Sequence, residues 1–153
     1  MSIETNRKLI LEFYQAFDQR NIDRAFALLA SNFVAHLAGI PETLDLDGFK
    51  EFGMMFYSAF TDGQHQFEQI IAAEDKVITC GTFTAIHTGT FQGLPTTGKQ
   101  ITISVMHIDR IEQGKIIEHW GQGDAQGLMQ QLGVMFFTSP KLMWKIFKDT
   151  IKK

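Results

Sequence analysis

Histidine and aspartate side chains stand within apolar rows in the second half of this sequence. From about residue 64, hydrophobic and polar residues alternate, which is typical of strands, where residues two apart share a face. Near 100–112, His107 and Asp109 share a face with isoleucine and valine side chains, and His87 ends a similar row near 76–88. Burying such groups costs free energy unless they are hydrogen-bonded, so a buried titratable group has either a hydrogen-bond partner or a function. These rows therefore carry candidates for acid–base chemistry, although an ordinary structural role is favoured for His87 taken alone.

Asp124 is the sharpest candidate for a proton-transfer group. Strict alternation along the last expected strand, near 115–122, gives one face to Ile116, Glu118, Trp120, Gln122 and Asp124. Asp124 also stands where this strand passes into a helix, so it can be a plain N-cap. The alternative is a general base buried in an apolar pocket beside Trp120 and His107. His107 itself is either a hydrogen-bond donor to a substrate oxygen or an ordinary core histidine.

The sequence gives no support to several other kinds of site. It has no H-E-x-x-H or H-x-H pattern, and its single cysteine, Cys80, excludes a cysteine pair, so no metal site is expected. The glycines of 121–127 have the wrong spacing for a dinucleotide fingerprint, and no G-x-S-x-G segment is present. No cofactor is expected either. The net charge of −3 argues against nucleic acid as a partner.

The elements that must position these residues change type along the chain. Helical spacing predicts three helices in the first half, one following Thr5 as its cap, one following Asn21, and one over about 47–60. A short strand is expected over 33–37. The second half predicts strands near 64–73, 76–88, 100–112 and 115–122, paired as an antiparallel meander, and then a short helix that stops at Gly133.

Helices followed by long strands indicate a single α+β domain. Strands of about 13 residues exceed the usual length and should curl. The curved sheet, closed by the N-terminal helices, would form a cone whose interior holds one small-molecule pocket. We expect this domain to span residues 1–133, with residues 134–153 as an amphipathic helical extension of it.

The extension and the N-terminus bear on location. Residues 141–153 carry five lysines and one aspartate opposite apolar side chains that include Trp144 and Phe147. Such a basic amphipathic helix packs on its own domain, swaps onto a second subunit, or makes weak contact with a membrane surface. Stable membrane insertion is not expected, because no apolar run approaches the ~20 residues of a span. The polar N-terminus lacks a signal-peptide core, so a cytoplasmic location is expected.

Residues 5–133 resemble the SnoaL-like polyketide cyclases of the nuclear transport factor 2-like superfamily, which have a cystatin-like fold. The segments that carry the resemblance are Phe33–His36, Ala59–Asp62, His87–Lys99, Gly114–Trp120, Asp124 and Gln131–Gly133. Two segments depart from the family pattern, because Thr61 stands where proline is common and the loop reads Leu94–Pro95–Thr96–Thr97–Gly98. The resemblance implies a cone-shaped α+β barrel with a deep pocket.

The resemblance also implies roles for particular residues. Characterised cyclases close a ring by intramolecular aldol condensation without metal or cofactor, and their catalytic acid/base matches Asp124. His107 would stabilise the enolate oxygen, and Trp120 would wall the pocket. With Trp120, the substrate-binding residues would be His36, His87, Tyr14, Phe56, Phe60, Val105 and Gln122.

Two functional hypotheses follow, with a third behind them. The first is a cofactor-independent cyclase or isomerase that acts on a small apolar carbonyl compound, and the second is a non-catalytic small-molecule binding module of the same fold. The third is an interaction protein whose sheet recruits a partner. A homodimer is expected through the strand face that carries Ile78, Cys80, Met106 and Ile108, because that face is too apolar for open solvent.

Overall fold

The computed structural model describes residues 2–134, and the predicted helical extension of residues 134–153 lies, apart from Val134, outside the described residues. The helices are α1 (Ile3–Asp18), α2 (Ile22–Ala27), α3 (Leu46–Ala59) and α4 (Ala125–Leu132). The strands are β1 (Leu29–Leu37), β2 (Leu44–Asp45), β3 (Phe60–Ala73), β4 (Lys76–His87), β5 (Gln100–Glu112) and β6 (Lys115–Gly123). The predicted α+β class is confirmed.

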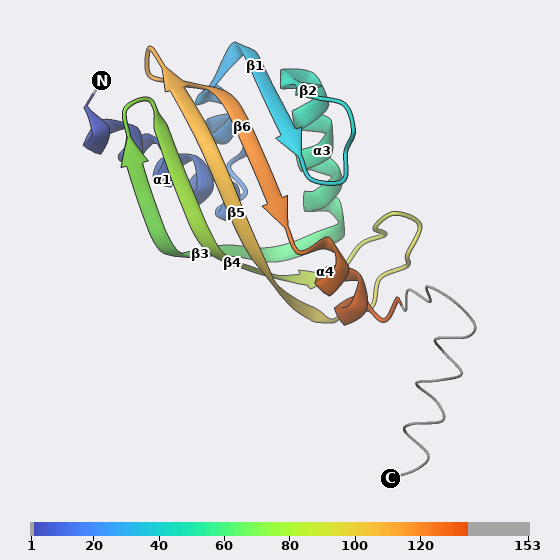
Figure 1. Cartoon of the computed structure of the whole chain (residues 1–153). Coiled ribbons are helices and arrows are strands. Elements are labelled where there is room, and N and C mark those ends of the chain that lie inside the picture. Colours follow the sequence, from blue (N-terminus) through green and yellow to red (C-terminus); the bar gives the residue numbers. More distant parts are fainter. Residues whose placement is uncertain (1, 135–153) are drawn as a thin grey trace.

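The strands form one curved mixed sheet in the order β2-β1-β6-β5-β4-β3. The antiparallel meander β3-β4-β5-β6 is confirmed, and β1 adds to it in parallel beside β6. Figure 1 shows α1 and α2 behind the sheet and α3 beside β1, and within residues 2–134 the helices cover one face of the sheet and leave the other uncovered. The helix-covered face is called the inner face below, and the opposite one the outer face.

Local sequence explains where the elements begin and end. The cap of α1 is Ser2, whose Oγ accepts the backbone N–H of Thr5, so the expected cap at Thr5 is wrong by one turn. Asn21 caps α2 as predicted, and α4 ends at Gly133 with a φ of 95°, which suits glycine. Gln113 and Gly114 both have positive φ in the turn between β5 and β6, as a tight hairpin turn requires.

The core consists of two apolar clusters at opposite ends of the long strands. One cluster joins α1 and α2 to β1 and includes Ile10, Phe13 and Ile111. The other joins the start of β5 to α4 and includes Ile101, Ile103 and Leu128. Between Ile103 and Ile111 on the same face of β5 lie His107 and Asp109, so the sheet carries a polar centre between two apolar ends.

One β-bulge decides which side chains of β6 point inward. Arg110 pairs with Glu118, but Ile111 pairs with Ile116, so Ile117 is an extra residue on β6. A one-residue offset exchanges the two faces for every residue that follows. His119 therefore points to the inner face beside Asp109, and Trp120 points to the outer face. The expected shared face of Ile116 and Trp120 is wrong for this reason.

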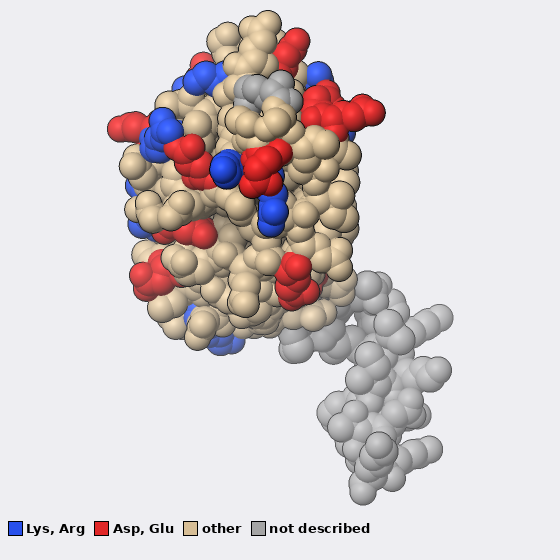
Figure 2. Space-filling view, turned by 90° about the vertical axis from the view of Figure 1, so that its left-hand side faces the viewer, with Lys and Arg blue, Asp and Glu red and all other residues tan. Residues whose placement is uncertain are grey.

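The surface of the described residues carries charges of both signs. On the side seen in Figure 2, lysine and arginine are interspersed with aspartate and glutamate, and no basic patch stands out. Within residues 2–134, no helix has both the length and the apolar character needed to cross a bilayer.

Candidate active site

A buried aspartate–histidine pair lies at the polar centre of the inner face. Asp109 and His119 are cross-strand partners on β5 and β6. Nδ1 of His119 lies 2.8 Å from Oδ1 of Asp109, and the two side chains are 6% and 0% exposed. Because an ionised carboxylate only accepts, His119 donates through Nδ1, which leaves Nε2 for another partner. An aspartate that holds a histidine in one tautomer is the arrangement that orients a general base.

Tyr14 of α1 satisfies the second oxygen of Asp109. The Tyr14 hydroxyl donates to Oδ2 of Asp109 at 3.1 Å. Burial, followed by the charge of Asp109 and this hydrogen bond, raises the pKa of Tyr14 well above its ordinary value. Tyr14 therefore remains a phenol and a donor. It ties α1 to the sheet and gives the second buried oxygen of Asp109 the hydrogen bond that a buried acceptor needs.

His107 lies beside this pair and stays neutral. Its Nδ1 is 3.1 Å from Oγ1 of Thr79, its cross-strand partner on β4, and its ring stacks on Tyr14 with the centroids 4.9 Å apart. Burial, followed by the electrostatic influence of the His119 and His65 imidazoles, lowers the pKa of His107 well below the ordinary value for histidine. In the tautomer in which Nδ1 accepts from Thr79, neutral His107 carries its proton on Nε2 and presents an Nε2–H donor to the cavity.

These groups line a cavity of about 920 Å³. This volume lies within the range of small-molecule sites. Its wall includes nine aromatic side chains besides Tyr14, namely Phe13, Phe17, Phe49, Phe52, Phe56, Tyr57, Phe60, Phe83 and Phe91, and its polar groups include His65, His107 and His119. An apolar wall with a few convergent titratable groups can bind an apolar molecule and present its polar atoms to acid–base groups.

Several predicted binding residues meet at this cavity. Tyr14, Phe56, Phe60 and Val105 line it together with His107, and Gln122 lies at its edge. His87 does not line it. The His87 side chain is completely buried, accepts the backbone N–H of Thr97, and packs against Phe60. His87 thus anchors the loop between β4 and β5.

Asp124 does not have the buried position that was expected. It is solvent-exposed and caps α4, with Oδ1 accepting the backbone N–H of Gly127 at 2.8 Å. Its neighbours Gly123 and Ala125 line the cavity, but Asp124 itself does not. The expected burial beside Trp120 and His107 is therefore wrong. The catalytic role implied by the resemblance stays a prediction, now for a residue near the rim.

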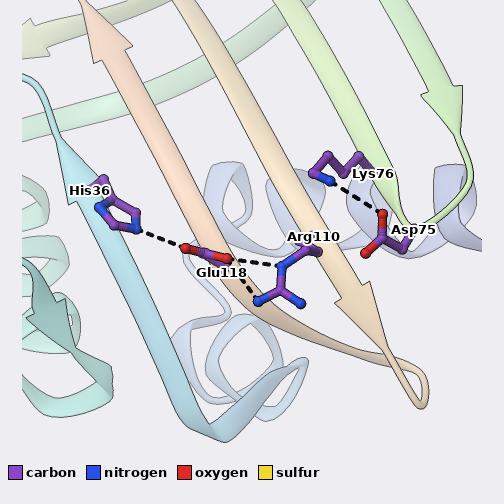
Figure 3. A network of polar contacts seen from close by, with 5 residues as sticks. All are labelled: His36, Asp75, Lys76, Arg110 and Glu118. Carbon is purple, nitrogen blue, oxygen red and sulfur yellow. Dashed lines mark hydrogen bonds and ion pairs between the residues drawn. The ribbon is translucent and has the colours of Figure 1, made fainter.

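Trp120 and His36 lie on the outer face of the sheet, so neither walls the cavity. Their rings stack with the centroids 5.0 Å apart, and both line a separate hollow of about 500 Å³. Figure 3 shows the adjoining network on this face, in which Glu118 joins His36 of β1 to Arg110 of β5. The bulge at Ile117 places Trp120 on the outer face, because it reverses the alternation of side chains along β6. The expectation that Trp120 walls the cavity depended on strict alternation.

Two histidines of the cavity were not singled out as site residues from the sequence. His119 was placed on the wrong face by strict alternation. His65 lines the cavity from β3 with Asp18 of α1 behind it, and the bond between them joins residues far apart in sequence, so no local pattern could reveal it. In the described part of the chain, no cluster of three or more histidine, cysteine, aspartate or glutamate residues could hold a metal ion.

Comparison with known proteins agrees with this geometry. The SnoaL-like polyketide cyclase family matches residues 8–132. Among solved structures, AclR of Streptomyces galilaeus, a proposed hydroxylase, shares 24% identity over 88% of this chain and 100% of its own, with a TM-score of 0.82. IdmH of Streptomyces antibioticus, a proposed polyketide cyclase, shares 26% over 84% of this chain and 99% of its own, with a TM-score of 0.76.

A third similar structure is a proposed polyketide cyclase from Acidithiobacillus ferrooxidans, with 28% identity over 86% of this chain and 97% of its own and a TM-score of 0.72. A search of curated proteins finds no match. The family match covers most of the chain and falls on the elements that build the sheet, the helices and the cavity. The chain therefore belongs to the SnoaL-like polyketide cyclase family.

Proposed function

We propose that this protein is a cofactor-independent enzyme of the cyclase or isomerase type that removes a proton next to a carbonyl group of an apolar substrate. The observation that carries the proposal is the Asp109–His119 pair on an aromatic-walled cavity beside a neutral His107. Family membership supports a cyclase-type role. The aromatic wall suits a flat, polyketide-like carbonyl compound.

In this mechanism His119 is the general base. Asp109 accepts the Nδ1 proton, so the lone pair of Nε2 takes the proton from the carbon next to the carbonyl. The electron pair of the broken C–H bond forms an enolate. Nε2–H of His107 donates to the enolate oxygen, and the largely apolar wall strengthens that bond. Because His107 is neutral, it acts as a donor and does not compete for the substrate proton.

Asp124 is the competing assignment for the base, because the family resemblance implies it. Its exposed position beside Gly123 and Ala125 leaves it near the cavity rim, where a substrate that projects from the cavity would reach it. If His119 is the base, replacing His119 abolishes proton removal and replacing Asp124 does not. If Asp124 is the base, the reverse is expected.

The test uses ortho-diacetonylbenzene, which is benzene with acetonyl groups on two adjacent carbons. Saturation-transfer NMR establishes that the probe binds, and proton NMR in D2O follows exchange of its methylene protons. We expect the wild type to catalyse exchange and His119→Asn to reduce the rate by about 100-fold or more. Asp124→Asn should retain the rate, because asparagine caps a helix as well as aspartate does.

Each other outcome has a definite meaning. Loss of exchange in Asp124→Asn with retention in His119→Asn would transfer the role of the base to Asp124. Binding of the probe without any exchange by the wild type would overturn the enzymatic proposal and favour the non-catalytic binding module.

We propose further that the protein forms a homodimer through the outer face of its sheet. A cross-strand row on this face runs from Ile71 through Ile78 and Ile108 to Trp120 and His36. Ile71 is 54% exposed and Met106, in the next row, is 56% exposed. Protein interfaces commonly have an apolar centre with polar and charged residues around it, and this row with its neighbouring charged network has the same composition.

A further inference from the structure

A second histidine–carboxylate pair lines the cavity, and the proposed base does not use it. Nδ1 of His65 lies 2.7 Å from Oδ1 of Asp18, and Oδ2 of Asp18 accepts the backbone N–H of His65 at 2.9 Å. These two bonds fix the ring and its Nδ1 proton. Nε2 of His65 has no hydrogen-bond partner within residues 2–134, and His65 contributes to the cavity wall.

The three histidines of the cavity stand in a row. His107 is in the middle, with its ring centroid 6.0 Å from that of His65 and 5.5 Å from that of His119. Tyr14 packs against both His65 and His107. Two oriented imidazoles therefore flank one neutral donor, so a substrate held at His107 has a titratable group on each side.

The two pairs differ in their access to water. The side chains of His65 and Asp18 are 15% and 13% exposed, whereas those of His119 and Asp109 are 6% and 0% exposed. The more accessible pair exchanges protons with solvent more readily. It is suited to deliver a proton in each turnover and to recover it from water, while the buried pair is suited to accept a proton from carbon.

We infer that His65 is a second catalytic residue, the general acid that protonates the acceptor carbonyl oxygen during ring closure, with Asp18 as its positioning residue. This role rests on the proposed carbonyl chemistry at His119. His119 takes a proton from the nucleophilic carbon, and the enolate carbon forms a C–C bond to the second carbonyl. The π electrons of that carbonyl move to its oxygen, which takes the Nε2 proton of imidazolium His65. Water then carries a proton from His119 back to His65.

The test separates the two histidines with one probe. Methylene exchange in ortho-diacetonylbenzene needs only a base and an enolate donor, whereas closure to the acetyl-substituted indanol also needs an acid at the second carbonyl. We expect His65→Gln and Asp18→Asn to exchange the methylene protons at a rate close to that of the wild type. Both variants should close the ring about 100-fold more slowly, a typical contribution of a general acid.

The control is Gln64→Ala, an exposed neighbour on β3, which should exchange and close as the wild type does. Thermal melts of all variants separate folding from chemistry.

Ring closure by His65→Gln at the wild-type rate would falsify the inference and leave His65 as an anchor between β3 and α1. Exchange without closure by the wild type would also overturn it while the proposed function stands. Failure of wild-type exchange would overturn the proposed function and the role of His65 with it.

Discussion

At the scale of single residues, Gly121 determines where the imidazole of His119 lies. A Cβ at Gly121 would lie 2.7 Å from Nε2 of His119 and 2.9 Å from Cδ2 of Leu37. Both distances are shorter than real Cβ contacts, so a side chain at this position forces the imidazole to move. The absence of a side chain is therefore what allows the proposed base to occupy its position.

We expect Gly121→Ala to reduce methylene exchange by about 100-fold, since a displacement of roughly 1 Å at a reacting group costs about that much. The matched control is Gly123→Ala two residues further along β6. Its Cβ would lie 3.7 Å from Cδ1 of Ile103, which is an ordinary contact. Exchange is measured by NMR as for the wild type. Equal rates in the two alanine variants would show that Gly121 has no part in placing His119.

At the scale of elements, the outer-face network joins three strands. Glu118 of β6 accepts from His36 of β1 and from Arg110 of β5 (Figure 3). Burial raises the pKa of Glu118, but the hydrogen bonds from His36 and Arg110 and the charge of Arg110 outweigh it and lower the pKa below 4.5. The folded state therefore favours the ionised carboxylate of Glu118.

This shift gives the network a defined pH dependence. Because the folded pKa of Glu118 is lowered, its contribution to stability is fully present above the unfolded value and is lost as the pH falls through the folded value. We expect Glu118→Gln to melt below the wild type at pH 7 and the gap in melting temperature to close as the pH falls below the unfolded value. Glu12→Gln is the control, because Glu12 and its partner Arg24 are 44% and 53% exposed and such pairs contribute little. If the difference in melting temperature between Glu118→Gln and the wild type persists at acid pH, the loss of stability comes from packing and not from the charge of Glu118.

At the scale of the whole molecule, the proposed dimer makes a prediction about association. Met106→Glu places a charge on the outer face, and a buried unpaired charge is costly, so we expect this variant to sediment as a monomer where the wild type sediments as a dimer. Ile3→Glu is the control, because Ile3 is 52% exposed on the first turn of α1, where a negative charge is favourable. A wild-type monomer at micromolar concentration would contradict the proposal.

Patterns in the sequence are enough to predict the kind of fold and part of the cavity wall. Helical spacing and strand alternation identified every helix of the described residues and the four long strands, because these signals are local and repeat over many residues. Alternation also placed His107 and Asp109 together on an apolar face of β5. The two-residue strand β2 has too few residues to leave such a signal.

Which polar groups meet in the cavity depends on how distant segments pack. The bulge at Ile117 arises from pairing between β5 and β6, and it exchanged the expected positions of His119 and Trp120. Asp18 and His65 are 47 residues apart in sequence and meet only because α1 packs on β3. Asp124 satisfies both a cap pattern and a family motif; the structure shows the cap at the start of α4, and the catalytic role stays a prediction. Register and long-range packing depend on contacts between distant segments, so no local pattern encodes them.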